Sequence, residues 1–264
     1  MMEKDRPLIL VTNDDGFEAA GIWALVEAVL PHGEVVIITP DGPRSAMGHA
    51  ITMNVPLRIR EFESPNGIKY YRTNGTPSDC VKLGQRVVLR DRKIDLVVSG
   101  INHGSNSSAS LLYSGTMAAA IEASFEGIPA IGFSLLDYSE KADFTAAKII
   151  ADYVVKKALA HPFPEHICLN VNIPKSPIEG INGIKITKQA HGYWHEDMVE
   201  REDAFGRPYY WLTGHLVTKD CDENACQCAL DNHYVSIQPV QFDMTAYKHI
   251  NDFKYLEQWK ITKE

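Results

Sequence analysis

The stretch Leu8-Ile9-Leu10-Val11-Thr12-Asn13-Asp14-Asp15-Gly16 decides the fold of this chain. Its first five residues, rich in branched apolar side chains, predict a buried parallel strand. The run stops at two adjacent carboxylates and a glycine. A helical spacing of apolar residues follows at Ile22, Leu25, Val26, Val29 and Leu30. Strand, acidic turn and helix together predict the opening of a βαβ unit.

Asp14 and Asp15 come directly after the predicted strand. In open α/β sheets the ligand crevice lies at the carboxyl ends of the strands. Two adjacent carboxylates repel each other unless a cation shares them or one is protonated. A hard divalent metal is the simplest resolution. The alternative is a solvated turn in which Asp15-Gly16 serves only the backbone, and this stretch alone does not decide between the two.

Composition limits the classes of function. The chain has 264 residues, enough for one large domain or a domain with an extension. Its net charge of −8 (26 basic minus 34 acidic residues) argues against binding a nucleic-acid duplex. No apolar run is long enough to span a bilayer, and the charged N-terminus does not resemble a signal peptide. An odd count of five cysteines favours a reducing, cytoplasmic location.

Strands and helices are expected to alternate after this opening. Strands are predicted at 34–39, 95–99, 130–134 and 167–171, helices at 76–89, 114–125 and 143–159, and a hairpin from 51–60 and 68–73 around Pro65-Asn66-Gly67. Between them, residues 100–106 are expected to form a polar, glycine-rich loop. The economical α/β fold for this order is a doubly wound, mostly parallel sheet with helices on both faces.

The character of the sequence changes at about Pro174. Strands remain probable beyond this point, but their alternation with helices stops, and aromatic residues cluster around Trp194 and Trp211. We therefore expect residues 1–174 to form the core that carries the metal site. Residues 175–264 are expected to form a β-rich extension that packs on the core or on another subunit, which predicts a homo-oligomer.

Four polar groups are expected to meet where this sheet changes direction. Asp14 and Asp15 follow the first strand, Ser45 follows the second, and Asn102 follows the strand at 95–99. Each of them taken singly is explained by a turn. Together they form a set of oxygen ligands that suits Mg²⁺ or Mn²⁺ and does not suit zinc. The combination at one sheet edge favours a metal site.

A second polar group lies at the predicted start of the helix at 114–125. Ser114-Gly115-Thr116 offers hydroxyls and free backbone amides, which make an anion site at a helix N-terminus. Gly104 and Gly115 would let backbone amides approach a phosphate closely, and Asn106 adds a donor. The simpler alternative is that Ser114 is an ordinary helix cap, which is compatible with phosphate binding.

Histidines and cysteines are weaker candidates. His49 and His103 lie in the candidate loops and could donate a proton or touch a substrate, although a lone loop histidine is more often solvated. Cys221, Cys226 and Cys228 with His233 fit no common zinc spacing, and a surface loop is the better interpretation.

Several uncommon motifs occur in an order that resembles the SurE (survival protein E) family of metal-dependent nucleotidases. They are TNDDG at 12–16, PRSA at 43–46, TNGTP at 73–77, SGINHGSN at 99–106, YSGT at 113–116, NVNIP at 170–174, GRPYYW at 206–211 and VSIQP at 235–239. The resemblance covers nearly the whole chain. The stretch from Cys221 to His233 departs from it, because it looks enlarged relative to the family pattern.

The resemblance implies a Rossmann-like core and a C-terminal extension used to form dimers and tetramers. It implies hydrolysis of nucleoside 5′- and 3′-monophosphates with one divalent cation, Mg²⁺ or Mn²⁺, per subunit. The family's metal-ligand positions match Asp14, Asp15, Ser45 and Asn102. The family's substrate-side positions match Asn106, Ser114 and Thr116.

The leading hypothesis is therefore a metal-dependent phosphomonoesterase, with water activated by the metal as nucleophile and with Asp14 and Asp15 as catalytic residues that hold the metal. A receiver-like signalling module also places two acids after its first strand. It needs an aspartate ending the third strand of its sheet and a lysine after the fifth. Here the strand at 95–99 ends in Ser99-Gly100, and no lysine follows Ser134 until Lys141. A nucleotide-binding module without turnover remains an alternative.

Overall fold

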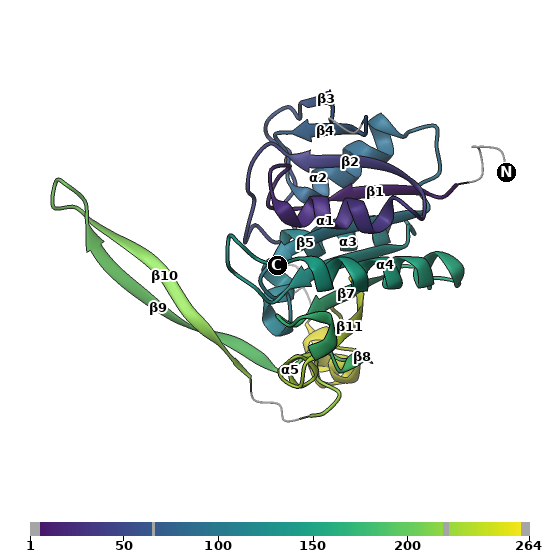
Figure 1. Ribbon diagram of the computed structural model, residues 1–264. Helices are drawn as coiled ribbons and strands as arrows, with labels where there is room; N and C mark the ends of the chain where they lie inside the picture. The colour runs from purple at the N-terminus through teal and green to yellow at the C-terminus, as the bar shows by residue number, and fades with distance from the viewer. Residues whose placement is uncertain (1–5, 65–66, 219–221, 260–264) are drawn as a thin grey trace, which may run out of the picture.

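The structure, a computed structural model, describes residues 6–64, 67–218 and 222–259 (Figure 1). Nine strands in this part of the chain form one sheet in the order β3-β4-β2-β1-β5-β6-β7-β11-β8. Their bounds are β1 (Leu8–Thr12), β2 (Glu34–Pro40), β3 (Ile59–Glu63), β4 (Lys69–Thr73), β5 (Leu96–His103), β6 (Ala130–Leu135), β7 (Ile167–Ile173), β8 (Gly183–Ile186) and β11 (Tyr234–Gln241).

The sheet is mostly parallel. The run from β4 through β2, β1, β5 and β6 to β7 is parallel throughout, whereas β3 pairs antiparallel with β4 and β11 pairs antiparallel with β7. The chain winds outward in one direction from β1 and in the other from β5, so the predicted doubly wound α/β fold is confirmed. Pairing of Thr12 with Ser99 brings the carboxyl ends of β1 and β5 side by side. The two aspartates follow β1, and Asn102 lies in the last part of β5.

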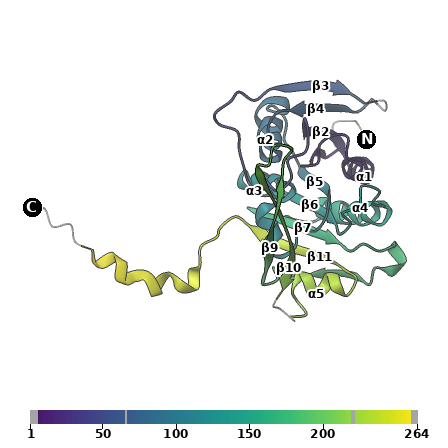
Figure 2. The same cartoon turned by 90° about the vertical axis from the view of Figure 1, so that its left-hand side faces the viewer.

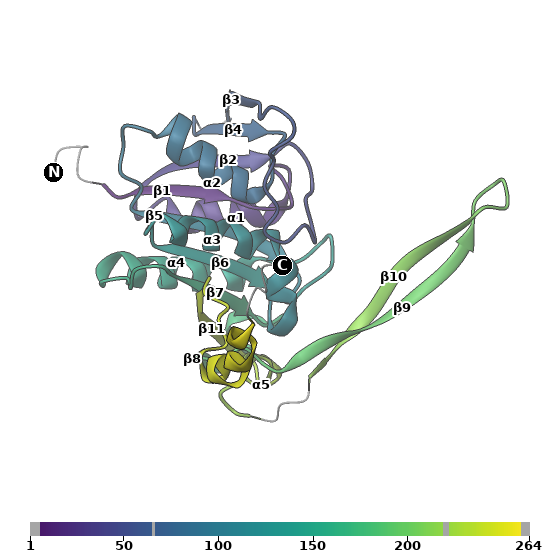
Figure 3. The ribbon, with the colours of Figure 1, turned by 180° about the vertical axis from the view of Figure 1, so that it is seen from behind.

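Helices cover both faces of the sheet. Figure 1 views the face covered by α1 (Ala20–Val29) and α4 (Thr145–Ala160), and Figure 3 views the face covered by α2 (Pro77–Leu83) and α3 (Gly115–Phe125). All five residues of β1 are buried between these layers. A Cβ on Gly21 would lie 2.0 Å from the carbonyl oxygen of Ile101, so α1 packs on the backbone of β5. This close contact fixes the acidic turn that precedes α1.

The remaining helical segments in the described part of the chain are one short α-helix and several segments of π or 3₁₀ type. They are η2, a π-helical turn (Gly84–Val88), the 3₁₀ segments η3 (Ser108–Tyr113), η4 (Ile178–Gly180) and η5 (Tyr247–Gln258), and α5 (Cys226–Asp231). The predicted helix at 76–89 is α2 continued by η2. No helix in the described ranges is both long and apolar enough to cross a membrane.

Two local predictions were wrong. The strand predicted at 51–60 overlaps β3 only at Ile59 and Arg60, because residues 51–58 lie in a largely exposed loop interrupted by Pro56. Part of the predicted turn, Pro65 and Asn66, lies outside the described residues. The loop predicted at 100–106 begins later than expected, because β5 continues to His103. It resumes pairing with β6 at Asn102 and Ser134 after a register shift.

The part of the chain after Pro174 divides between the sheet and two projections. Strands β8 and β11 extend the main sheet beyond β7. Strands β9 (Gly192–Glu202) and β10 (Pro208–Thr218) form a separate antiparallel hairpin that projects from the body (Figure 1). Segment η5 also extends away from the body (Figure 2).

Candidate active site

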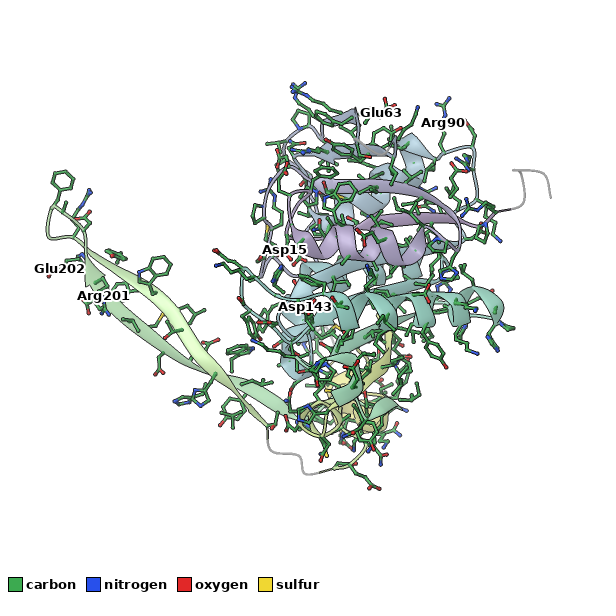
Figure 4. All side chains as sticks on the ribbon, viewed as in Figure 1. Asp15, Glu63, Arg90, Asp143, Arg201 and Glu202 are labelled. Atoms are coloured by element: carbon green, nitrogen blue, oxygen red, sulfur yellow. The ribbon has the colours of Figure 1, made fainter. Side chains whose placement is uncertain are left out.

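A cavity of about 570 Å³ lies at the carboxyl ends of β1 and β5. Its walls come from the loops after β1, β2 and β5, from the start of α3, and from the base of the β9–β10 hairpin. Figure 4 shows Asp15 on the side of the body from which this hairpin projects. The lining residues include Asp14, Ser45, Asn102, His103, Asn106, Tyr113, Ser114, Tyr138, Trp194, Glu196, Leu212 and Thr213.

Asp14 is buried where the turn after β1 meets the first turn of α3. Its Oδ1 accepts a hydrogen bond of 2.6 Å from the hydroxyl of Thr116. Gly115 permits this contact, because a Cβ there would lie 2.7 Å from the Cβ of Asp14. Burial and the neighbouring charge of Asp15 raise the pKa of Asp14 to about 6, although the Thr116 bond opposes the shift. Asp14 is therefore a carboxylate whose charge is poorly compensated by the chain itself.

Asp15 is partly buried, and burial also raises its pKa, while the nearby His103 opposes the shift. Its Oδ2 is buried and has no hydrogen-bond partner within the described residues. The turn is held by Asn13, whose side chain bonds both the carbonyl oxygen and the amide of Gly16 at 2.8 and 3.2 Å. A buried carboxylate oxygen without a partner is costly, and a bound cation would supply the missing partner.

Ser45 and Asn102 complete the predicted ligand set. Ser45 is exposed in the loop after β2, and the adjacent amide of Arg44 donates to the carbonyl oxygen of Asp14 at 2.7 Å. Asn102 directs its amide group at the carbonyl oxygens of His103 and Gly104, at 3.1 and 2.9 Å. Its side-chain carbonyl oxygen is left for a ligand.

The residues present fit a hard divalent cation. Asp14, Ser45 and Asn102 line one cavity, and Asp15 lies next to them in the same turn. All four offer oxygen atoms. Among the described residues no group of three or more His, Cys, Asp or Glu side chains could hold a metal, and this includes Cys226, Cys228 and His233. Cys221 lies outside the described residues.

The predicted phosphate side divides into two parts. Ser114 and Asn106 line the cavity. Ser114 caps α3 by accepting a 3.0 Å bond from the amide of Met117, so its own hydroxyl hydrogen stays available. Thr116 is fully buried and its hydroxyl is engaged by Asp14, so it lies against the aspartate and does not line the cavity. Gly115 likewise contacts Asp14.

Sequence analysis missed the residues that hold Asn106. Asn170 and Asn172, both fully buried in β7, bond its carbonyl oxygen and its amide at 2.9 and 2.8 Å. The side chain of Asn106 donates to Ser134 at 2.8 Å. Two asparagines spaced i, i+2 in an otherwise apolar strand share one face. Because buried polar groups need partners, that spacing was an available signal.

The apolar wall of the cavity was also missed. Trp194, near the base of the hairpin, and Leu212, near its middle, line the cavity together with Tyr113 and Tyr138. The Trp194 indole donates to the hydroxyl of Ser110 at 3.1 Å, which fixes the ring against the core. The aromatic cluster around Trp194 was noticed in the sequence, but only as a packing surface.

Fold and cavity together define the class. The strand order matches that of doubly wound nucleotide-binding sheets, with an acidic crevice at the point where the winding reverses. The family model described as survival protein SurE matches residues 9–196. The chain belongs to the SurE family.

Relatives support this assignment over the full length. The chain is 49% identical to a protein of Christiangramia forsetii named 5′-nucleotidase SurE, over 98% of this chain and 99% of the relative. It is 43% identical to a protein of the same name from Chlorobium luteolum, over the whole of both chains. The crystal structure of the SurE protein from Aquifex aeolicus superposes with a TM-score of 0.82 at 39% identity. That match covers 95% of this chain and 100% of the other.

Proposed function

We propose that this chain is a 5′-nucleotidase, a divalent-metal-dependent phosphomonoesterase that releases phosphate from nucleoside 5′- and 3′-monophosphates. The names of its relatives support the nucleotidase activity. The single observation that carries the proposal is the buried, under-compensated pair Asp14 and Asp15 at a cavity also lined by Ser45 and Asn102. Such a site suits an anionic substrate only when a cation is present.

Asp14, Asp15, Ser45 and Asn102 are the residues that would hold one Mg²⁺ or Mn²⁺. When bound, the cation neutralises phosphate charge and lowers the pKa of water. Two carboxylates are needed in this set, because the hydroxyl of Ser45 and the amide of Asn102 are neutral and cannot offset a dication. We assign Asp14 as the acceptor of the nucleophile's proton, because its carboxylate lines the cavity beside the proposed cation.

The phosphate is proposed to lie at the start of α3. The free hydroxyl hydrogen of Ser114 donates to a phosphoryl oxygen, and the positive end of the helix dipole favours the negative charge there. Asn106 keeps one amide hydrogen for the phosphate beyond its bond to Ser134. These donors stabilise charge that develops on the phosphoryl oxygens.

The nucleoside is proposed to lie against the apolar wall. The cavity is within the range of about 300 to 1,000 Å³ typical of small-molecule sites. Trp194, Tyr113 and Tyr138 offer aromatic faces to a base, and Glu196 and Thr213 offer polar groups to the sugar or base.

Phosphate release from a panel of nucleoside monophosphates tests this function. We expect turnover with Mg²⁺ or Mn²⁺ and none after treatment with a chelator. An aryl phosphate serves as the control for general phosphatase activity. Tight nucleotide binding without phosphate release would instead support the binding module.

A single turnover in ¹⁸O-labelled water, with enzyme in excess, tests the nucleophile. Direct attack by water forms the new P–O bond from solvent, so the label enters phosphate on the first turnover. Attack by a carboxylate, the covalent alternative, would instead form an aspartyl phosphate; water attack on it at the carboxyl carbon labels the aspartate, and attack at phosphorus labels the phosphate. An acid quench during the turnover separates the two routes, because only the covalent route leaves phosphate bound to the protein.

We also propose a homodimer or homotetramer built through the extension. The hairpin exposes Tyr210, Trp211 and Leu212, and η5 exposes Phe253, Tyr255 and Leu256. Large apolar side chains clustered on projecting segments support burial against a partner.

A further inference from the structure

A buried carboxylate lies outside the cavity, on the same helix that contacts Asp14. Glu122 in α3 is only 4% exposed. Its Oε2 pairs with Nε2 of His49 at 2.9 Å, and its Oε1 accepts from the ammonium of Lys82 in α2. Burial acts to raise the pKa of Glu122, but the bonds from His49 and Lys82 outweigh it and the pKa lies below its usual range. Glu122 is therefore a charged anchor between two other segments.

His49 belongs to the loop that carries Ser45. This loop, residues 41–58, contains no helix or strand. Ala46 and Gly48 adopt left-handed backbone conformations, with φ of 58° and 56°. Because a non-glycine residue rarely holds such a conformation unaided, the loop depends on contacts with its surroundings.

The loop is held on both sides of Ser45. Before it, the amide of Arg44 bonds the carbonyl oxygen of Asp14 at 2.7 Å. After it, the amide of Gly48 bonds the carbonyl oxygen of Tyr113 at 3.0 Å, and His49 reaches Glu122 and stacks on Phe125 with ring centroids 5.2 Å apart. The side-chain contacts of His49 both end on α3.

One helix therefore touches two parts of the site. The first turn of α3 holds Asp14 through Thr116, and Glu122, six residues further on, holds the Ser45 loop through His49. We propose that Glu122 is a positioning residue for the metal site, which acts through His49 on the loop that presents Ser45. This inference rests on the proposed function for the assignment of Ser45 as a ligand.

Glu126 provides a matched control. It lies one turn further along the chain, at the end of α3, and pairs with Arg86 and Gln85 of η2 at 2.8 and 3.3 Å. It therefore makes an interhelix ion pair like that of Glu122 but has no bond to the Ser45 loop. E126Q therefore controls for the loss of an interhelix charge pair, and exchange in the sheet shows whether E122Q, a change at a buried residue, destabilises the whole fold and not only the loop.

The experiment compares the full-length wild type with E122Q, H49Q and E126Q. Amide hydrogen exchange of the metal-free proteins measures the order of residues 44–50, and electron paramagnetic resonance of free Mn²⁺ measures metal affinity. We expect faster exchange at 44–50 in E122Q and H49Q, and we expect exchange in the sheet to be unchanged. We expect their Kd for Mn²⁺ to rise about 10-fold, the scale of loss for groups that support a metal ligand. E126Q should match the wild type in both measurements, and saturating Mn²⁺ should restore kcat in E122Q.

In exchange at 44–50 and in Mn²⁺ affinity, the double variant H49Q/E122Q should behave like either single variant, because both substitutions remove the contact between His49 and Glu122. Wild-type exchange at 44–50 and wild-type Mn²⁺ affinity in both E122Q and H49Q would overturn the positioning role. If E122Q fails to fold, H49Q still tests the contact from the exposed side. A wild type that binds no Mn²⁺ would refute the proposed metal site, whereas the exchange measurement would still decide whether Glu122 orders the loop.

Discussion

The burial of apolar side chains differs between the sheet around β1 and the β9–β10 hairpin. Every residue of β1 is buried beneath helices of the same chain. On the hairpin, Trp211 is 61% exposed, and the two strands pair only with each other. A two-stranded ribbon alone is marginally stable in water. The first region is covered by its own chain, and the second leaves large apolar side chains exposed.

The cavity lies where these two regions meet. The proposed metal and phosphate groups come from the sheet, its loops and α3, while Trp194, Glu196, Leu212 and Thr213 come from the hairpin. The comparison therefore predicts separable effects. Changes in the sheet region should affect chemistry and the stability of the fold, and changes in the hairpin should affect substrate preference and assembly.

The largest effect is expected from Asp14→Asn or Asp15→Asn. Changing a group that only supports a metal ligand lowers metal affinity or activity by about 10- to 100-fold. We therefore expect kcat/KM to fall by more than about 100-fold, with the fold retained. The measurement is nucleotide hydrolysis at several Mn²⁺ concentrations, with Asp91→Asn, an exposed acid paired with Arg90, as control. Near-normal turnover in either variant would remove that residue from the site.

The second effect concerns the pH dependence of stability in metal-free protein. The pKa of Asp14 is raised to about 6 in the folded state from 3.8. The unfolded chain therefore loses this proton first, and stability falls as pH rises from about 4 to about 6. The shift corresponds to roughly 3 kcal/mol.

Denaturant unfolding in a chelator measures this prediction. Asp14→Asn, which cannot ionise, should be more stable than the wild type at pH 7, and the difference should vanish near pH 4. Parallel stability curves for the two proteins across this range would contradict the burial of an uncompensated charge in the sheet region.

A smaller effect on substrate binding is expected where the hairpin meets the cavity. Stacking of a base on an aromatic side chain is worth about 1–3 kcal/mol. Trp194→Ala should therefore raise KM for nucleotides roughly 10-fold and leave KM for an aryl phosphate nearly unchanged. Phe205→Ala, near the far end of the hairpin and 82% exposed, is the control. Equal losses for both substrates would mean that Trp194 shapes the cavity without contacting the base.

The smallest effect on catalysis is expected from the outer hairpin. Tyr210→Ser with Trp211→Ser should reduce the particle mass seen by sedimentation at micromolar concentration, because it removes apolar area at the proposed interface. The unfolding transition of the sheet should shift little. A wild type that sediments as a strict monomer would refute the assembly proposal.

Much of the fold could be predicted because its signals are local. The apolar run at 8–12, the two acids and the helical spacing after them lie within one short stretch, and β1 and α1 match it. The extension of β5 to His103 could not be predicted, because glycines at 100 and 104 resemble a loop. Only pairing with β6, distant in sequence, makes those residues a strand.

The candidate site follows the same division. The positions of Asp14 and Ser114 follow from a strand end and a helix start, which can be recognised in the sequence, whereas Asn102 lies within β5 and not in the loop expected after it. The contact of Thr116 with Asp14 and that of His49 with Glu122 join residues 102 and 73 positions apart. Such contacts depend on how α3 packs, and the local sequence does not predict them.

Gly115 limits which substitutions the site can accept. A methyl group there would lie 2.7 Å from Cβ and 2.9 Å from Oδ2 of Asp14, closer than nonbonded atoms can approach. The helix would have to retreat or the carboxylate turn away. In a library that varies residue 115, we expect glycine alone to be accepted. The smallest residue in the site is thus its least replaceable.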